Sequence, residues 1–377
     1  MVTRVTASST LSSRSGDDSS PHSNSLILMP GQQNQRYEGV RADLAKMPRT
    51  WLITGVAGFI GANLLADLLS LGQNVVGLDN FSTGHRSNIA DVLASSGASS
   101  RFRMIEGDTR DIDACRAACA GVDFVLHQAA LGSVPRSIHD PLTSSHVNVD
   151  GLMNVLFAAH GAGVQRVVYA SSSSVYGDSR HLPQVEARTG RLLSPYAATK
   201  AVNEMYADVF QRTYGIETVG LRYFNVFGPR QDPNGAYAAV IPRWIAALLR
   251  GERCKIFGDG ETSRDFCYIA NVLQANVLAA TTGAAASTGT AYNIACGDST
   301  SLTSLFYLIR DGLAKFDSAV ATAEPQYEAF RPGDINQSFA NISKAREALG
   351  YEPSHRIGEG MAATLDWYVQ HGASRVG

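Results

Sequence analysis

The sequence predicts an α/β fold in which a doubly wound parallel sheet is followed by a smaller, mixed C-terminal domain. Two short apolar runs at residues 51–54 and 74–78 flank a segment, 59–71, whose apolar residues repeat at helical spacing. Strand, helix and strand in this order form a βαβ unit, which is normally parallel and right-handed. Because the alternation of strand and helix continues to about residue 222, a doubly wound sheet is the expected architecture.

The remaining elements are predicted from the same kind of local pattern. A short helix at residues 37–46 ends before Pro48, and a second helix begins at Pro195, a residue suited to a first helical turn. Beyond Arg222 the alternation breaks into loops rich in proline and glycine, which suits a smaller lobe over the carboxyl ends of the strands. The other predicted strands are residues 103–105, 123–126, 167–170 and 217–222, and a further helix is predicted at 148–160.

Composition excludes several classes of partner. The 377 residues are 45% hydrophobic and 18% charged, and the formal net charge of -2 gives no general attraction to nucleic acid or anionic membranes. No apolar run approaches the ~18 residues that a membrane span needs. The five cysteines are spread without metal-like pairs, and even Cys115 and Cys119 lack a nearby partner. We therefore expect buried or half-buried free thiols, no metal site and a cytoplasmic enzyme.

Residues 1–35 are predicted to be a disordered tail, because they are rich in Ser and Thr and poor in apolar residues. Their one apolar run, residues 26–29, is shorter than the core of about 7–15 residues that a signal peptide needs. A cleaved organelle-targeting peptide is the alternative interpretation, and Asp17 and Asp18 argue against it.

Three glycines after the first predicted strand indicate a dinucleotide-binding loop. They are spaced Gly55-x-x-Gly58-x-x-Gly61, and Asp79 ends the second strand about 20 residues further on. Glycine lets the backbone approach a pyrophosphate, and the following helix presents free N–H groups and partial positive charge. Asp79 can accept hydrogen bonds from both adenosine ribose hydroxyls and would repel a 2′-phosphate. NAD is therefore expected rather than NADP.

Other strand ends complete the predicted cofactor site. Asp108 follows a strand and is placed to meet the adenine edge, with helix capping as the alternative role. Gln128, Ala129 and Ala130 end the fourth strand, where the backbone would line the nicotinamide side. The full cofactor-binding set comprises Gly55, Gly58, Phe59, Ile60, Gly61, Asp79, Asn80, Asp108, Gln128, Ala129, Ala130, Tyr196, Lys200 and Tyr223.

A serine run and a Tyr-x-x-x-Lys pair predict the catalytic groups. Tyr196 and Lys200 lie one helical turn apart and therefore share a face. A free tyrosine has a pKa near ~10, and a lysine cation and a positive nicotinamide ring would both lower it. Tyr196 could then take a proton from a sugar hydroxyl, with Ser172 bonded to the same oxygen. The predicted catalytic set is Ser172, Ser173, Ser174, Tyr196 and Lys200.

Taken together, the glycine loop, the segment from Ser172 to Gly177 and the Tyr196-x-x-x-Lys200 pair resemble the extended short-chain dehydrogenase/reductase superfamily. Four longer stretches, at residues 127–137, 222–228, 231–242 and 258–266, narrow the resemblance to bacterial UDP-N-acetylglucosamine 4-epimerases. The resemblance runs from about Arg36 to the last helix. It implies a Rossmann domain that holds NAD, and a homodimer that pairs through a four-helix bundle.

The resemblance also implies roles at a UDP-sugar site. Asn225 would meet the sugar diphosphate, Val240 the uridine, and Phe257 would pack on uracil. Arg264 and Arg331 would neutralise the phosphates, which a guanidinium fork suits. The full substrate-binding set comprises Ser133, Arg136, Ser172, Ser173, Tyr196, Asn225, Ala239, Val240, Phe257, Arg264, Arg331, Asp334 and Ser338.

One position bears on the size of the sugar. Asp334 would accept from the uridine ribose, and in galactose-type epimerases the fourth residue beyond the matching aspartate is a bulky tyrosine that crowds the 2-substituent. Here that residue is Ser338, which leaves room for an N-acetyl group. We therefore expect interconversion of UDP-N-acetylglucosamine and UDP-N-acetylgalactosamine. UDP-glucose can also fit, because a larger pocket need not exclude a smaller ligand.

The resemblance also implies how the chain is divided. Beyond the tail we expect an NAD-binding Rossmann domain at residues 36–222, to which part of 265–295 returns. Residues 223–264 and 296–377 would form the UDP-sugar-binding domain.

Three rival functions stay open at this point. A UDP-glucuronate 4-epimerase shares the Val-Tyr-Gly and Tyr-Ala-Ala-Thr-Lys segments. A 4,6-dehydratase would carry Asp-Glu before its Tyr-Gly, where this chain has Ser173, Ser174 and Val175. A non-catalytic NAD-binding regulator would be expected to lose Tyr196 or Lys200, and both are present.

Overall fold

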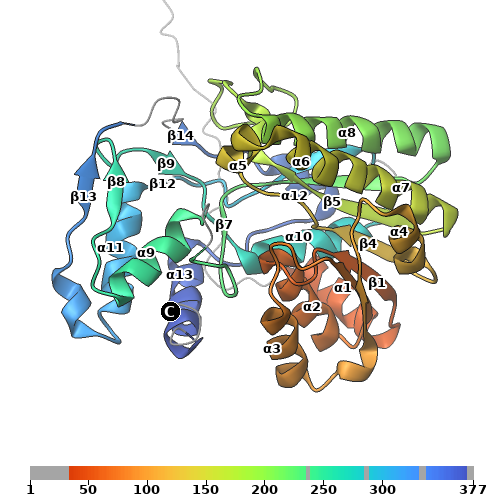
Figure 1. Ribbon diagram of the computed structural model, residues 1–377, viewed down its shortest axis with the longest axis horizontal. Coiled ribbons are helices and arrows are strands. Elements are labelled where there is room, and N and C mark those ends of the chain that lie inside the picture. The colour runs from red at the N-terminus through yellow and green to blue at the C-terminus, as the bar shows by residue number, and fades with distance from the viewer. Residues whose placement is uncertain (1–33, 235–237, 284–287, 331–336, 372–377) are drawn as a thin grey trace, which may run out of the picture. The chain divides into compact units, whose positions relative to one another are not determined.

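Seven parallel strands form the central sheet of the computed structural model, which describes residues 34–234, 238–283, 288–330 and 337–371. Every neighbouring pair of strands in this sheet is parallel. The predicted α/β class and the doubly wound parallel sheet are therefore confirmed (Figure 1). From one edge to the other the strands are β3 (Phe102–Glu106), β2 (Asn74–Asp79), β1 (Thr50–Thr54), β4 (Phe124–His127), β5 (Arg166–Ser172), β6 (Glu217–Tyr223) and β11 (Thr290–Ile294).

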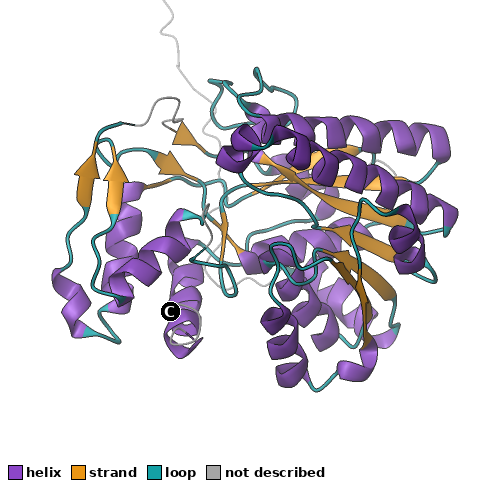
Figure 2. Ribbon diagram, viewed as in Figure 1, coloured by secondary structure: helices purple, strands orange, loops and turns teal. Residues whose placement is uncertain are grey.

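Helices cover both faces of this sheet (Figure 2). Successive side chains of a strand point to opposite faces, so Trp51 and Ile53 of β1 join one core cluster while Leu52 joins the other. The first cluster includes residues of α2 (Phe59–Ser70), α3 (Arg86–Ser96) and α10 (Ile269–Thr281). The second includes residues of α4 (Ile112–Cys119), α7 (Gly151–Gly161) and α8 (Pro195–Tyr214).

Several helices were not predicted, and two of them are too short to show a 3.6-residue period. These two are α5 (Val134–His139) and α6 (Pro141–Ser145). The helix predicted at 148–160 begins instead as a π-helical turn at His146–Asp150 and continues as α7. The other helices are α1 (Gln35–Lys46), α9 (Val240–Leu249), α11 (Leu302–Leu313), α12 (Ser343–Leu349) and α13 (Ile357–His371), with 3₁₀ turns at Ser99–Arg101, Ser173–Tyr176 and Ser318–Thr322.

Small sheets replace the βα alternation after β6. They are built from two- and three-residue strands that the sequence patterns did not reveal. The pairs are β7 (Val226–Phe227) with β10 (Cys267–Tyr268), and β8 (Lys255–Phe257) with β13 (Gln326–Glu328). The three-stranded sheet places β9 (Ser263–Arg264) between β12 (Thr300–Ser301) and β14 (Gln337–Ser338).

The chain order of the large sheet reverses at β1, which lies between β2 and β4. In open parallel sheets, ligands bind in the crevice outside the carboxyl ends of the strands at such a switch point. After β10, the chain returns to the large sheet through α10 and β11, and β11 pairs with β6. The fold therefore places residues before 223 and residues after 265 around one sheet.

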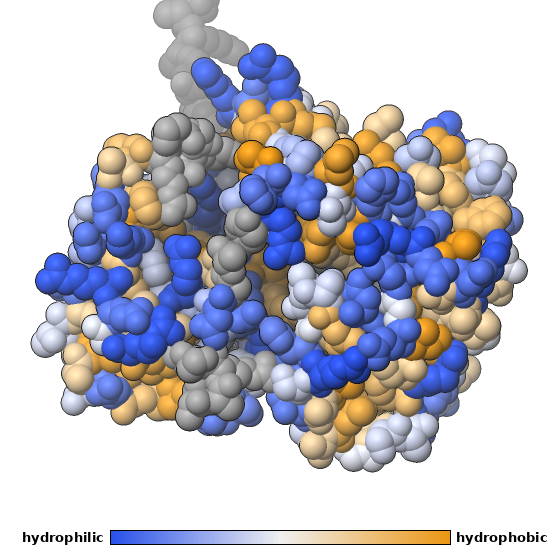
Figure 3. All heavy atoms as spheres, in the orientation of Figure 1, coloured by the Kyte–Doolittle hydropathy of each residue, from blue (hydrophilic) through white to orange (hydrophobic). Residues whose placement is uncertain are grey.

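The surface and the thiols carry little sign of other ligands. All five cysteines are buried and free, as the sequence indicated. In the part of the chain that the structure describes, no helix is long and apolar enough to cross a membrane, and no group of three metal-binding side chains is assembled. Hydrophilic residues are spread over the face drawn in Figure 3, among smaller hydrophobic areas.

Candidate active site

A continuous cleft lies at the carboxyl ends of the central strands. It consists of two adjoining pockets, one of which extends to Asp108 and Val147, while the other extends to Ser172, Tyr196 and Asn225. The lining residues that both pockets share are Gly55, Gly58, Thr83, Gln128 and Ala130. The predicted dinucleotide loop thus lies between the predicted adenine end and the predicted catalytic end.

The loop after β1 is packed closely enough that a side chain cannot be accommodated at Gly55 or Gly61. Glycine at these positions lets the backbone approach a pyrophosphate. Gly55 has a φ of 70°, and a Cβ on Gly61 would lie 2.1 Å from the Gly55 carbonyl oxygen. Gly58 precedes α2 and has no side chain to cap it. The first-turn N–H groups of this 12-residue helix are therefore left for an anion at the cleft.

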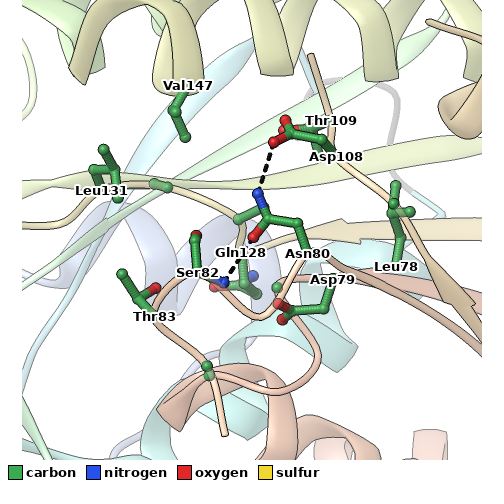
Figure 4. Close-up of a pocket in the computed structure, with 16 residues that line it drawn as sticks. Leu78, Asp79, Asn80, Ser82, Thr83, Asp108, Thr109, Gln128, Leu131 and Val147 are labelled. Carbon is green, nitrogen blue, oxygen red and sulfur yellow. Dashed lines mark hydrogen bonds between the residues drawn. The ribbon is translucent and has the colours of Figure 1, made fainter. Parts of the chain in front are cut away.

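Asp79 is held in place by the backbone of two loops. Its Oδ2 accepts from the Ala57 N–H at 2.9 Å, and its Oδ1 accepts from the Phe81 N–H at 2.7 Å. A carboxylate has further lone pairs, and Asp79 lines the pocket drawn in Figure 4. The side chain is thus fixed at the end of β2 and can still accept from ribose hydroxyls.

Asp108 lines the same pocket and is not the cap of the following helix. Asp111 is the N-cap of α4, and its side chain accepts from the Asp113 N–H. Asp108 instead accepts from the Arg110 side chain at 2.7 and 3.0 Å. It also accepts from Asn80 Nδ2 at 2.6 Å, as Figure 4 shows. The Arg110 side-chain hydrogen bonds are the main cause that lowers the pKa of Asp108 to about 2. Asp108 therefore lines the pocket and does not cap α4, and its contact with adenine stays a prediction.

Gln128 belongs to a polar network that joins three elements. Its Nε2 donates to Asn276 Oδ1 at 3.1 Å, and its Oε1 accepts from the Tyr223 hydroxyl at 3.2 Å. Asn276 Nδ2 in turn donates to the Tyr223 hydroxyl at 2.9 Å. Tyr223 and Gln128 both line the cleft. Sequence reasoning missed Asn276 because it lies on α10, far along the chain and without a motif.

The predicted catalytic groups converge at one end of the cleft. Ser172 Oγ accepts from the Ser174 N–H at 3.1 Å and from the Ser174 hydroxyl at 2.9 Å. Ser172 Oγ is the acceptor in both contacts, so its own proton is available for Tyr196, which lines the same cleft and whose pKa Ser172 lowers. Ser173 lines the cleft beside Ser172, whereas Ser174 supports Ser172 from behind.

The charges at this end of the cleft differ from the expectation. Burial raises the pKa of Tyr196, and the Ser172 hydrogen bond lowers it only in part. Lys200 Nζ donates to the Ala170 carbonyl at 2.8 Å and lies 5.9 Å from the centroid of the Tyr196 ring. Burial also lowers the pKa of Lys200, to about 8. The predicted lowering of the tyrosine pKa by lysine is therefore not seen in the structure.

The start of α8 is fixed by α5. The Tyr196 N–H donates to Ser137 Oγ at 3.0 Å, and the Ser137 hydroxyl donates to the Val134 carbonyl. Ser133 caps α5 by accepting from the Arg136 N–H at 3.1 Å. Since Ser133 and Arg136 also line the cleft, α5 both shapes the site and positions Tyr196.

The predicted substrate residues are placed in two groups. Asn225 and Ala239 line the cleft beside Tyr196, and Val240 follows directly as the first residue of α9. Phe257, Arg264 and Ser338 lie on the small sheets and are not part of the lining of these two pockets. Strand pairing sets Ser338 beside Arg264, and the Ser338 hydroxyl donates to Gln184 Oε1 at 3.4 Å. Arg331 and Asp334 lie outside the described residues.

The loop after β7, residues 228–234, also lines the cleft, and no sequence motif predicted this. Buried Asn63 of α2 donates to the Pro229 carbonyl at 3.0 Å and accepts from Arg230 NH1 at 3.0 Å. His85 Nε2 lies 3.3 Å from Asp232 Oδ2. These contacts join the dinucleotide loop region to the C-terminal part of the chain. Arg230, Gln231 and Asp232 line the cleft opposite Gly58 and Phe59 as a result.

Comparison with known proteins identifies relatives of this chain. Residues 51–295 match the NAD dependent epimerase/dehydratase family. The chain is 37% identical over 319 residues to UDP-glucose 4-epimerase of Mycolicibacterium smegmatis, with 84% of this chain and 97% of the relative covered. It is 31% identical to UDP-glucuronate 4-epimerase 4 of Arabidopsis thaliana, with 85% and 76% covered.

A solved structure is similar over the same range. It is UDP-N-acetylglucosamine 4-epimerase from Methanobrevibacter ruminantium M1 in complex with UDP-N-acetylmuramic acid. The identity is 35% and the TM-score 0.78, with 86% of this chain and 99% of that chain covered. The similarity therefore extends from the dinucleotide loop through most of the C-terminal part.

We expect Gly61→Ala to abolish cofactor retention. Its new Cβ would clash with the Gly55 carbonyl oxygen and push α2 away from the loop that meets the pyrophosphate. Purified protein should then carry no NAD, measured by absorbance after acid release. Gly39→Ala is the matched control, because a Cβ at Gly39 meets nothing within 4 Å. Retention of NAD by Gly61→Ala at the wild-type level would refute the proposed fit.

Proposed function

Because the chain belongs to the NAD dependent epimerase/dehydratase family and has NAD as its cofactor, we propose that it interconverts UDP-N-acetylglucosamine and UDP-N-acetylgalactosamine at C4. The observation that carries this proposal is the meeting of Ser172, Tyr196 and Lys200 beside the dinucleotide loop in one cleft. The similar UDP-N-acetylglucosamine 4-epimerase structure supports the sugar assignment.

The residues of the cleft have distinct chemical tasks in this reaction. NAD, when bound, takes the hydride from C4 and returns it. Tyr196 removes the proton of the C4 hydroxyl, and the Ser172 hydroxyl bonds the same oxygen and relays the proton. Lys200 fixes the strand behind Ser172 through the Ala170 carbonyl. Inversion then needs a site that grips the nucleotide and leaves the sugar ring room to turn.

We assign that grip to the predicted diphosphate and uridine residues. The catalytic end of the cleft is lined by Asn225 and by Ala239, the residue before α9, and Val240 is the first residue of that helix. Arg264 and Arg331 would neutralise the diphosphate, because guanidinium groups suit phosphate oxygens. This assignment gives the proposed UDP-sugar domain, residues 223–264 and 296–377, the role of holding the nucleotide, while residues 36–222 with part of 265–295 hold NAD.

Elimination is disfavoured by the residues before Tyr176. A 4,6-dehydratase needs an acid and a base near C5 and C6, whereas the turn after β5 carries Ser173, Ser174 and Val175. A UDP-glucuronate 4-epimerase stays the second candidate, because relatives of that name share similar identity with this chain. The five buried free thiols support a reducing compartment such as the cytoplasm.

A substrate panel tests the proposed reaction directly. The protein should convert UDP-N-acetylglucosamine to UDP-N-acetylgalactosamine, followed by NMR of the anomeric protons, with UDP-glucose and UDP-glucuronate run in parallel. Tyr196→Phe removes the proton acceptor, so turnover should fall about a hundredfold or more while NAD stays bound. Tyr214→Phe, at the exposed end of the same helix, is the control and should keep full turnover. Near-normal turnover of Tyr196→Phe would refute its role.

Ser338→Tyr tests the size argument. A phenol ring at this position should crowd the 2-substituent, so kcat/KM for N-acetylated substrates should fall about tenfold or more relative to UDP-glucose. Ser338→Ala keeps the small volume and removes only the bond to Gln184, so it should keep the wild-type preference. Equal losses on both substrate classes in Ser338→Tyr would defeat the argument.

We also propose that the chain is a homodimer that pairs through α7 and α8. These two helices contact each other and present exposed apolar side chains to solvent. Such side chains at helical spacing favour burial against a second copy, which would complete a four-helix bundle. They are Phe157, Met205, Tyr206, Val209 and Tyr214.

Met205→Glu should convert this dimer to a monomer, measured by sedimentation velocity. A charge at a position that is 67% exposed in one copy costs little there but would be buried between two copies. Phe316→Glu is the control, because Phe316 is 50% exposed just beyond α11 and away from α7 and α8. A wild-type protein that sediments as a monomer contradicts the proposal.

A further inference from the structure

Three consecutive residues at the end of β5 are each held by one face of α8. The Ala170 carbonyl accepts from Lys200 Nζ at 2.8 Å. The Ser171 hydroxyl donates to Glu204 Oε1 at 2.5 Å, and Ser172 lines the cleft together with Tyr196, whose pKa it lowers. The three α8 residues are spaced four apart, so they lie on one face of the helix. Glu204 is thus the third residue on the face of α8 that carries the predicted catalytic residues Tyr196 and Lys200.

Glu204 is itself fixed by a buried arginine on the next strand. Arg222 Nε and NH2 donate to the two carboxylate oxygens of Glu204 at 2.9 and 2.7 Å. Arg222 NH1 also donates to the Tyr176 hydroxyl at 3.1 Å and to the Glu186 carbonyl at 3.0 Å. This two-pronged pair leaves the Glu204 carboxylate little freedom. The Ser171 hydroxyl therefore meets an acceptor whose position is set from β6.

We propose that Glu204 is a positioning residue of the epimerisation site: it fixes the strand segment that carries Ser172 and supplies the negative charge that keeps the neighbouring Lys200 protonated. The proposal rests on the proposed function and adds a residue to its machinery. Glu204 is not itself a lining residue of the cleft, so it acts through Ser171 and Lys200, which are.

The charges around Lys200 support the second half of this proposal. Burial lowers the pKa of Lys200, and Glu204 raises it. His127 faces Lys200 from β4, but burial lowers its pKa to about 3, so it is neutral near pH 7. Burial raises the pKa of Tyr169 on β5 well above its ordinary value, so Tyr169 is neutral too. Arg222 on β6 is the other fixed charge nearby, and its field on Lys200 opposes that of Glu204.

Removing the carboxylate charge should move the pH dependence in one direction. A lysine is charged below its pKa, so loss of the Glu204 charge lowers the pKa of Lys200 and discharges it at lower pH. The limb of the activity profile that reports the protonation of Lys200 should therefore move toward lower pH.

Glu204→Gln tests this with full-length holoenzyme and UDP-N-acetylglucosamine. We expect kcat to fall about tenfold and the profile of kcat/KM against pH to move down by about one unit. Glu204→Asp keeps the charge but shortens the reach to Ser171, so its kcat should fall while its profile stays near wild type. Profiles of Glu204→Gln and wild type that coincide would overturn the proposal.

Glu217→Gln is the matched control. Arg166 donates to Glu217 Oε2 at 2.5 and 2.8 Å, and this second arginine–glutamate pair joins β5 to β6 at the ends of the strands opposite to Ser171 and Arg222. Its loss should lower the thermal midpoint without moving the pH profile. A shift in Glu217→Gln equal to that in Glu204→Gln would mean that the effect is general, which also overturns the proposal.

Ser171→Ala tests the positioning role of Glu204 apart from its charge. It also provides a second test if Glu204→Gln does not fold. It removes the hydroxyl but keeps both charges, so kcat should fall severalfold while KM and the pH profile stay unchanged. An unchanged kcat refutes the positioning role. If wild type epimerises none of the UDP-sugars, the proposed function fails instead. The inference is then decided by the titration of Lys200 itself, followed by NMR of its labelled side chain, whose midpoint should still be lower in Glu204→Gln and unmoved if the inference is wrong.

Discussion

A buried lysine ammonium is the constraint around which the site is organised. Lys200 is 2% exposed, and a charge at such depth is tolerated only where hydrogen bonds and an opposite charge replace water. The Ala170 carbonyl supplies the hydrogen bond at 2.8 Å, and Glu204 supplies the charge one turn further along α8. The hydrogen bond from Lys200 to Ala170 therefore fixes the position of α8 relative to β5. Tyr196 and Ser172 come together as a consequence.

The cleft depends on contacts between segments far apart in the chain. The loop after β7 is held to α2 through Asn63, whose amide bonds both Pro229 and Arg230. Asp265 is buried and accepts from the backbone N–H groups of Cys296, Gly297 and Ala340, so it joins the segment after β9 to the segments after β11 and β14. The loops at the carboxyl ends of the Rossmann strands are enough to form the dinucleotide end of the cleft. The other end depends on these long-range contacts, because buried polar groups need hydrogen-bond partners.

Local patterns were enough to predict the large sheet and the motifs that lie at its strand ends. The glycine loop, Asp79 and the Tyr196–Lys200 pair are read from a few neighbouring residues, because steric and helical periodicity act over that range. The return of the chain to the large sheet was predicted only from the family resemblance, and the network of Asn276 was not predicted. Asn276 meets Gln128 across 148 residues of sequence, and two-residue strands such as β9 have no period to detect. Such features depend on tertiary packing, which a single sequence shows only indirectly.

The tyrosine pKa is where sequence reasoning and structure differ most usefully. Burial raises the pKa of Tyr196, and the hydrogen bond from Ser172 offsets only part of that cost. Lys200 Nζ donates to the Ala170 carbonyl of β5 and lies 5.9 Å from the centroid of the Tyr196 ring. A phenolate at this depth therefore needs a further positive charge at the open side of the ring, where the cleft continues toward the dinucleotide loop. An oxidised nicotinamide ring would supply such a charge at that side, so binding of the cofactor and the protonation state of Tyr196 would be coupled.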